Sequence, residues 1–169
     1  IPVDEINENK NHLAVLKAVA DLNLPNFTYV ICGQGPRRQE YETFIAKYNL
    51  QNVVKLLGFR KDVQDVLKAS DAFIMPSFRE GLPMSMMEAM NLGLPILASN
   101  IRGCKDLVTV ERNGFLFEPT NIAQIKEQIL KLYKNKDLCE KIRKNNLEDI
   151  KQYSVENVKK ELNEIYKEV

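Results

Sequence analysis

Short apolar segments alternate with amphipathic segments along this 169-residue chain, and the alternation limits the possible folds more than any other feature. The apolar segments are residues 27–32, 52–58, 71–77, 94–99 and 114–119. Segments with a helical spacing of apolar side chains are residues 8–23, 36–50, 62–70, 82–93, about 104–110, 121–134, 136–152 and 155–168. Such alternation is typical of parallel strands joined by right-handed helical crossovers. We therefore predict an α/β fold, a doubly wound parallel sheet flanked by helices, with a C-terminal helical tail over 121–169.

Composition favours a globular protein whose single domain covers residues 1–169. Apolar residues make up 44% of the chain, and 24 basic against 23 acidic side chains give a net charge of +1. This balance argues against nucleic acid as a partner and against membrane binding driven by charge. The three widely spaced cysteines predict reduced thiols of a cytoplasmic protein. The single histidine, His12, excludes any site that needs two.

Glycine and charged residues follow four of the predicted strands, where ligands bind in doubly wound sheets. These loops read "CGQGP", "GFRKD", "PSFREGLP" and "SNIRGCKD". In "GQGPRR" Arg38 occupies the third glycine position of a dinucleotide fingerprint, and no acidic residue ends the next strand. No glycine loop is followed by Lys-Ser or Lys-Thr, so neither a nicotinamide site nor a P-loop is indicated. A tight turn before a proline-started helix remains the simpler explanation of "GQGP".

The segment "SFREGLPMSMMEAMNLGLPILAS" carries two glutamates eight positions apart. Gly81 permits backbone geometry that other residues resist, and Pro83 starts a helix well. The amides of Met84 and Ser85 then point out of the helix start, where the dipole favours an anion such as phosphate by about 0.3–1 kcal/mol. Glu80 lies just outside this start and is suited to accept hydrogen bonds from hydroxyl groups.

Glu88 shares the helix face of Met84 and is surrounded in sequence by methionines. A buried carboxylate needs hydrogen bonds, which the two hydroxyls of a ribose would donate. Sugar at Glu80, phosphates at the helix start and ribose at Glu88 fit a nucleoside diphosphate sugar. In the alternative explanation, Glu80 caps a helix and Glu88 pairs with a lysine or arginine. The methionines are explained more simply by core packing than by ligand binding.

The same segment resembles the E-x7-E region of family 4 retaining glycosyltransferases of the GT-B fold. The motifs "NKNH", "CGQGP", "LLGFRKDV", "ASDAFIMPS", "IRGCKDLV" and "NGFLFEP" occur in the order of that family, so the likeness covers nearly the whole chain. It is most similar to bacterial enzymes that build capsules or exopolysaccharides. The resemblance implies a Rossmann-like, donor-binding C-terminal half, with an acceptor-binding N-terminal half missing and the active site between them.

The resemblance also implies a role for each matching residue. Glu80 would touch the donor sugar, Lys10 would neutralise the diphosphate, and Glu88 would hold the ribose. Glu80 and Lys10 are therefore the predicted catalytic residues. The predicted donor-binding residues are Gly33, Gly58, Phe59, Arg60, Glu80, Gly81, Leu82, Met84, Ser85 and Glu88. The donor implied is a UDP-sugar, and neither a metal nor a cofactor is implied.

One departure from the family pattern concerns the second phosphate. Many members carry an arginine five residues before the lysine, where this chain has Glu5. Arg60, Arg102 and Lys105 are the candidates for the replacing cation, in that order.

The function predicted is transfer of a hexose-type sugar to a glycan or lipid-linked acceptor in surface polysaccharide biosynthesis. The isolated domain would be inactive, and the full-length enzyme would be cytoplasmic with a possible peripheral contact at the membrane. Alternatives are a noncatalytic nucleotide-sugar-binding module and a nucleotide-sugar epimerase of the same fold. Hydrolysis by a carboxylate pair is disfavoured, because Glu88 should lie deep and far from Glu80. The last helix has an apolar stripe (Val155, Val158, Leu162, Ile165 and Tyr166) that packs on this domain or crosses to the missing half.

Overall fold

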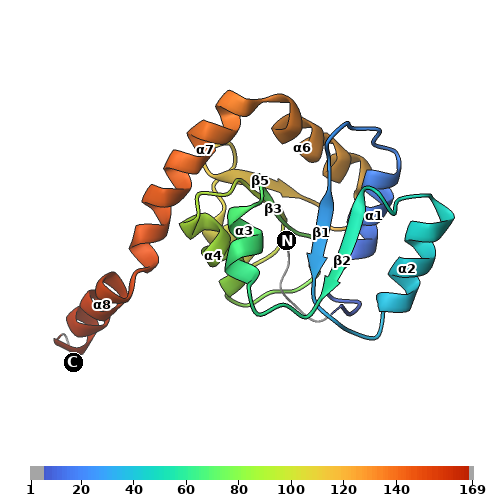
Figure 1. Cartoon of the computed structure of the whole chain (residues 1–169). Coiled ribbons are helices and arrows are strands. Elements are labelled where there is room, and N and C mark those ends of the chain that lie inside the picture. Colours follow the sequence, from blue (N-terminus) through green and yellow to red (C-terminus); the bar gives the residue numbers. More distant parts are fainter. Residues whose placement is uncertain (1–5, 168–169) are drawn as a thin grey trace.

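The computed structural model describes residues 6–167 and confirms the predicted α/β architecture (Figure 1). All strand pairs among the named strands are parallel. The strands are β1 (Tyr29–Cys32), β2 (Val54–Gly58), β3 (Phe73–Met75), β4 (Ile96–Ser99) and β5 (Gly114–Phe117). Each lies within a predicted apolar segment, and the segments' outer residues form the adjoining loops.

The strands form two hydrogen-bonded ladders. One joins β1 to β2, and the other has the order β3-β4-β5. Residues of both ladders share one hydrophobic cluster, which includes Ile31 of β1 and Ile74 of β3. The chain therefore runs from β1 to its neighbour β2, and then from β3 to the edge strand β5 on the far side of β4 in sequence order β3-β4-β5. In doubly wound sheets, ligands bind beyond the carboxyl ends of the strands.

Helices cover both faces of the strands. The helices are α1 (His12–Ala20), α2 (Arg38–Lys47), α3 (Val63–Lys68), α4 (Met84–Asn91), α5 (Cys104–Leu107), α6 (Ile122–Lys134), α7 (Lys136–Asp149), the 3-10 helix η1 (Ile150–Tyr153) and α8 (Val155–Lys167). Helices α1, α2 and α6 pack with one cluster, whereas α3, α4 and α5 pack with the other. Neighbouring strand residues divide between them: Leu97 belongs to the first, and Ile96 and Ala98 belong to the second. This is the alternation expected of a strand buried on both faces.

The first helix begins later than its apolar period predicted, at His12 instead of residue 8. Asn11 adopts a left-handed backbone with φ 49°, so the chain turns sharply before the helix starts. Residues 7–11 therefore form a loop, whose side chains reach the loops that follow the strands. His12 itself is buried, and its Nδ1 lies 3.0 Å from the Tyr29 hydroxyl.

The predicted helical tail is present, and its last helix projects away from the strands in Figure 1. Helix α6 packs on α1 and β5, whereas α8 makes its main contacts with η1. Val155, Val158 and Tyr166 of the predicted stripe are exposed, with relative exposures of 62%, 42% and 76%. The side chains of Leu162 and Ile165 lie outside the described residues. The Val155, Val158 and Tyr166 side chains therefore do not pack on the core of this domain.

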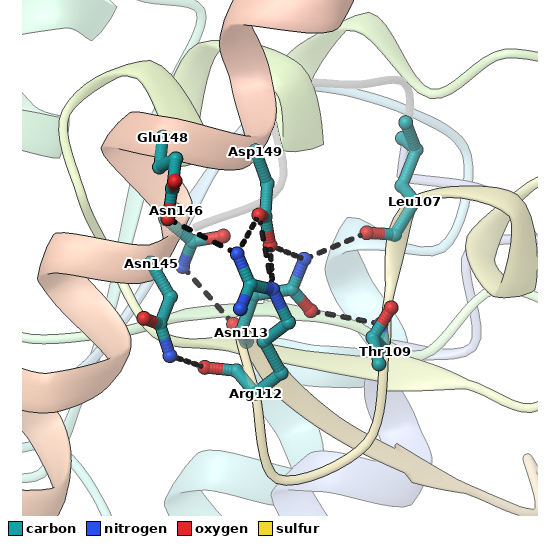
Figure 2. A network of polar contacts seen from close by, with 8 residues as sticks. All are labelled: Leu107, Thr109, Arg112, Asn113, Asn145, Asn146, Glu148 and Asp149. Atoms are coloured by element: carbon teal, nitrogen blue, oxygen red, sulfur yellow. Dashed lines mark hydrogen bonds and ion pairs between the residues drawn. The ribbon is translucent and has the colours of Figure 1, made fainter.

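A polar network joins the loop before β5 to the end of α7 (Figure 2). The Arg112 guanidinium donates to both carboxylate oxygens of Asp149, at 2.6 to 3.1 Å, and to Glu148 at 3.1 Å. Asn113 donates to the same Asp149 carboxylate at 3.1 Å. Buried Asn146 donates to the Leu94 and Asn113 carbonyls at 2.8 and 3.0 Å. These contacts hold the C-terminal end of α7, which precedes η1 and α8, against the loop before β5.

Candidate functional site

The loop of residues 7–11 is hydrogen-bonded along its length to the loop between β3 and α4. The Phe78 amide donates to the Asn9 carbonyl at 2.8 Å, and the Asn9 side-chain amide donates to the Arg79 carbonyl at 2.9 Å. Residues 7–11 and 76–80 are far apart in the sequence, and these contacts place them side by side at the carboxyl end of β3.

Lys10 and Glu80, the two predicted catalytic residues, form an ion pair between these loops. Lys10 Nζ lies 3.0 Å from Glu80 Oε1, and the two side chains are only 12% and 13% exposed. The alternative in which Glu80 caps a helix is wrong, because α4 has Pro83 at its N-cap and no side-chain cap. The pair unites a positive charge suited to phosphate with a hydroxyl acceptor.

Unbonded amides lie at the start of α4, next to Glu80. Within residues 6–167, no group accepts a hydrogen bond from the amides of Gly81, Leu82, Met84 or Ser85. The amides of Met84 and Ser85 are orphan donors of the kind that every helix start leaves, and those of Gly81 and Leu82 belong to the turn that leads into it. Leu82 and Met84 are exposed, at 58% and 59%. The predicted anion site is therefore open to a ligand.

The prediction that position 81 needs the backbone freedom of glycine is wrong. Its φ is not among the positive values of the chain, and a Cβ added there would have nothing within 4 Å. Backbone geometry therefore does not require glycine at this position. What glycine leaves at position 81 is empty space beside the unbonded amides.

Gly103, at the start of α5, packs its backbone against the turn that contains Glu80 and Gly81. Gly103 has φ +84°, and an added Cβ would lie 2.2 Å from the Gly81 carbonyl oxygen. Cys104 follows it and is fully buried. Burial raises the pKa of the Cys104 thiol to about 12, with Glu80 adding to the increase and Lys10 opposing it. This thiol stays protonated at neutral pH.

The expectation that Glu88 is buried among methionines is wrong. Helix α4 turns Met86, Ala89 and Met90 into the core and leaves Met84 and Glu88 on its exposed face. Glu88 does share the face of Met84, as its spacing predicted, but that face is the solvent side. No residue of the described part of the chain pairs with its carboxylate. The ion pair proposed for Glu88 in the alternative explanation is therefore also not formed there.

The glycines predicted to border the donor lie together where β1 and β2 end. The Gly33 amide donates to the Gly58 carbonyl at 2.8 Å. Gly35 has a packing role, because a Cβ there would lie 2.4 Å from the Ile6 carbonyl oxygen. Phe59 follows Gly58 and is 70% exposed, so its ring is accessible to a ligand.

The three candidate cations for the second phosphate differ in their surroundings. Arg60 forms two charge-assisted hydrogen bonds with Asp62, which raise the pKa of Arg60 and lower that of Asp62. Arg102 and Lys105 are exposed, and neither pairs with any residue in 6–167. They flank Gly103 and Cys104, beside the turn at Gly81. Glu5, the departure from the family pattern, lies outside the described residues.

Other features of the described chain add no site. No group of three or more His, Cys, Asp or Glu side chains in residues 6–167 is arranged to hold a metal ion. None of the helices in this range is long and apolar enough to cross a membrane. An open hollow between α1 and α2 contains no predicted site residue; it is lined by Leu13, Gln39, Glu40, Thr43, Phe44 and Lys47. The three cysteines are unpaired, as predicted.

A parallel α/β layer with a lysine and an open helix start at the carboxyl ends of its strands defines a nucleotide-binding domain. The chain belongs to the glycosyl transferases group 1, whose family model matches residues 1–149. The resemblance noted in the sequence is therefore confirmed, and a transferase is favoured over a noncatalytic module or an epimerase.

Known proteins similar to the chain include one curated galactosyltransferase and two solved structures. The UDP-Gal:alpha-D-GlcNAc-diphosphoundecaprenol alpha-1,3-galactosyltransferase of Escherichia coli is 40% identical over 108 residues, which are 63% of this chain and 28% of that protein. A TarM variant from S. aureus, solved with fondaparinux, alpha-GlcNAc-glycerol and UDP, is 26% identical with a TM-score of 0.86, over 95% of this chain and 34% of TarM. Alr3699/HepE from Anabaena, solved with UDP, is 24% identical with a TM-score of 0.91, over 99% of this chain and 48% of HepE. The chain spans less than half the length of each. The likeness to HepE concerns the fold.

Proposed function

We propose that the chain is the donor-binding half of a retaining glycosyltransferase that transfers a hexose-type sugar from a UDP-sugar to a glycan or lipid-linked acceptor. The observation that carries this proposal is the Lys10–Glu80 pair beside the unbonded amides at the start of α4. It offers a cation and N–H donors to a diphosphate and a carboxylate to a sugar. Support for UDP and for a polysaccharide pathway comes from the UDP held by TarM and the named activity of the Escherichia coli relative.

In this proposal the residues divide the work of holding the donor. Lys10 and the amides of Gly81, Leu82, Met84 and Ser85 bind the diphosphate and stabilise the negative charge that builds on it as the sugar leaves. Glu80 accepts hydrogen bonds from hydroxyls of the sugar, and Glu88 accepts hydrogen bonds from the two hydroxyls of the ribose. Gly33, Gly58, Phe59 and Arg60 border the base. No metal takes part in this scheme.

Arg102 is the cation that we propose for the second phosphate, in place of Arg60. The guanidinium of Arg60 is already held by Asp62, and a phosphate would have to displace that carboxylate. Arg102 is exposed and precedes Gly103, whose backbone touches the Gly81 turn. Lys105, one helical turn further, is the second choice.

The acceptor, the cleft and the cellular setting belong to the whole protein. We propose that an N-terminal half binds the acceptor and that α8 packs against that half with its exposed Val155 and Val158. The unpaired thiols support a cytoplasmic location, with the membrane contacted only at its surface.

Calorimetric titration of the chain with UDP, GDP and UDP-hexoses tests the proposal. UDP is expected to bind weakly and more tightly than GDP, and no sugar is expected to be transferred by the chain alone. Absence of heat with all of these ligands would contradict the proposal. Pyrophosphate separates the contribution of the anion site from that of the base.

A further inference from the structure

Asn11 occupies the N-cap position of α1 but does not cap the helix. Asparagine at this position ordinarily accepts a hydrogen bond from an amide of the first turn, which is worth about 1 kcal/mol. Helix α1 has no such bond. The Asn11 side chain instead donates to the Pro119 carbonyl at 2.8 Å and to the Pro76 carbonyl at 3.1 Å. The side chain thus makes two long-range hydrogen bonds in place of a local cap, to residues that are 65 and 108 positions away in the sequence.

The two acceptors are rigid points of the fold. Pro76 directly follows β3, and Pro119 lies just beyond the end of β5. The proline ring restricts the backbone at both positions. One side-chain amide therefore bridges the carboxyl ends of two strands, while the left-handed backbone of Asn11 (φ 49°, ψ 29°) turns the chain into α1.

Lys10 lies between two residues that are fastened in this way. Asn9 is bonded to Phe78 and Arg79 on one side, and Asn11 is bonded to Pro76 and Pro119 on the other. A lysine side chain has many rotamers, and holding it in one place is entropically unfavourable. Fixing its backbone on both sides reduces the range of positions that the ammonium can reach.

We propose that Asn11 is a positioning residue that acts through Lys10: its bridge between Pro76 and Pro119 holds the Lys10 ammonium beside Glu80, where the donor diphosphate binds. The effect on donor binding rests on the proposed function, whereas the effect on Lys10 does not. Two measurements therefore test the inference separately.

The first measurement is the rate of reductive methylation of Lys10, read by peptide mass spectrometry with exposed Lys17 as internal reference. Asn11→Gly keeps the left-handed backbone and removes the amide, and it is expected to speed Lys10 methylation about tenfold, as two lost hydrogen bonds would allow. Asn26→Gly is the matched control, because Asn26 is exposed with φ 56° and its side chain bonds to no residue in 6–167. Asn11→Asp keeps the size of the side chain without the N–H donors and should behave like Asn11→Gly. Unchanged Lys10 reactivity in either folded Asn11 variant overturns the inference.

The second measurement is the affinity for UDP in a double-mutant cycle. Asn11→Gly is expected to weaken UDP binding about tenfold in the wild-type background and to have no effect in a Lys10→Met background. An equal loss in both backgrounds means that Asn11 does not act through Lys10. If the wild-type chain binds neither UDP nor GDP, the proposed function fails, and the methylation rates still decide the role of Asn11.

Discussion

Lys10 Nζ lies 3.0 Å from Glu80 Oε1, although the two residues are 70 positions apart in the chain. The pair is largely shielded from water, so its interaction is screened less than that of an exposed ion pair. A diphosphate that binds beside α4 would share the Lys10 ammonium with the Glu80 carboxylate. The Glu80 carboxylate is thus held by the cation that we propose for the diphosphate.

Replacing Lys10 by methionine is expected to weaken UDP binding about 10- to 100-fold, because a hydrogen bond to a charged group contributes about 1.5–3 kcal/mol. Calorimetry with UDP measures the loss. Lys17→Met is the control, because Lys17 is exposed on α1 and lies outside the site. A folded Lys10→Met chain with wild-type affinity would remove Lys10 from the site.

Glu88→Gln is expected to leave the free energy of unfolding within about 0.5 kcal/mol of wild type, because the side chain is exposed and unpaired within residues 6–167. UDP affinity should nevertheless fall. The loss of affinity should be smaller with 2′-deoxy-UDP, which lacks one of the two hydroxyls that would donate a hydrogen bond to Glu88. Urea unfolding and calorimetry give the two values. Glu127→Gln on exposed α6 surface is the control. Equal losses with UDP and its deoxy analogue would assign Glu88 another role.

Alanine substitutions at Gly81 and Gly103 should show which glycine leaves room for a ligand and which one is needed for backbone packing. Gly81→Ala is expected to preserve stability or to raise it by about 0.4–1 kcal/mol, since the backbone is unstrained and the methyl group meets nothing within 4 Å. It should weaken UDP binding by filling the space beside the amides.

Gly103→Ala should instead destabilise the fold, since its φ is +84° and the methyl group would lie 2.2 Å from a carbonyl oxygen. Thermal unfolding of both variants, with UDP titration of Gly81→Ala, checks the pair. Wild-type UDP affinity in Gly81→Ala would count against a ligand at this turn.

His12 should make the fold sensitive to acid. Burial lowers the pKa of His12 from 6.5 to about 3, so between these values the unfolded chain binds a proton that the folded chain does not. The contribution of neutral His12 is complete above pH 6.5 and is lost as the pH falls, at about 1.4 kcal/mol per pH unit. Urea unfolding at about pH 7 and pH 5 should show a smaller decrease for His12→Gln than for wild type. Equal decreases would mean that His12 is not buried in its neutral form.

Asp149 and Glu148 both contact Arg112 but should differ in importance. The Asp149 side chain is 14% exposed and also accepts from Asn113, whereas that of Glu148 is 71% exposed. Asp149→Ala is therefore expected to lower the melting temperature, and Glu148→Ala to change it little. A wild-type melting temperature for Asp149→Ala would show that the network in Figure 2 does not stabilise the end of α7.

Elements of the fold with a clear period could be predicted from the sequence. The five strands alternate with helices as expected, and Gly93, with φ +76°, ends α4 as predicted. The start of α1 could not be predicted from its apolar period, which fits a helix that begins at residue 8 as well as one that begins at His12. Asn11 stands at the N-cap position, where an asparagine side chain ordinarily caps its own helix. Its side chain bonds instead to two carbonyls that are distant in sequence, and no local pattern reports such contacts.

The candidate site could be predicted only in part, because it too depends on contacts between residues that are distant in the sequence. The family resemblance pointed to Lys10 and the E-x7-E segment pointed to Glu80. Neither showed that the two residues pair, since that contact depends on how two distant loops pack. The apolar sequence around Glu88 suggested burial, yet a helix that buries only one face leaves position 88 in water. The family pattern favours Arg60 among the candidate cations, but Asp62, two residues later, already holds its guanidinium.

The contact between Gly103 and the Gly81 carbonyl has a consequence for redesign of the protein. Libraries that vary residues 100–105 to alter substrate preference would need to hold position 103 constant, since any side chain there pushes on the turn that carries Glu80. Diversity is better introduced at Arg102 and Lys105, whose exposed side chains can change without moving that turn.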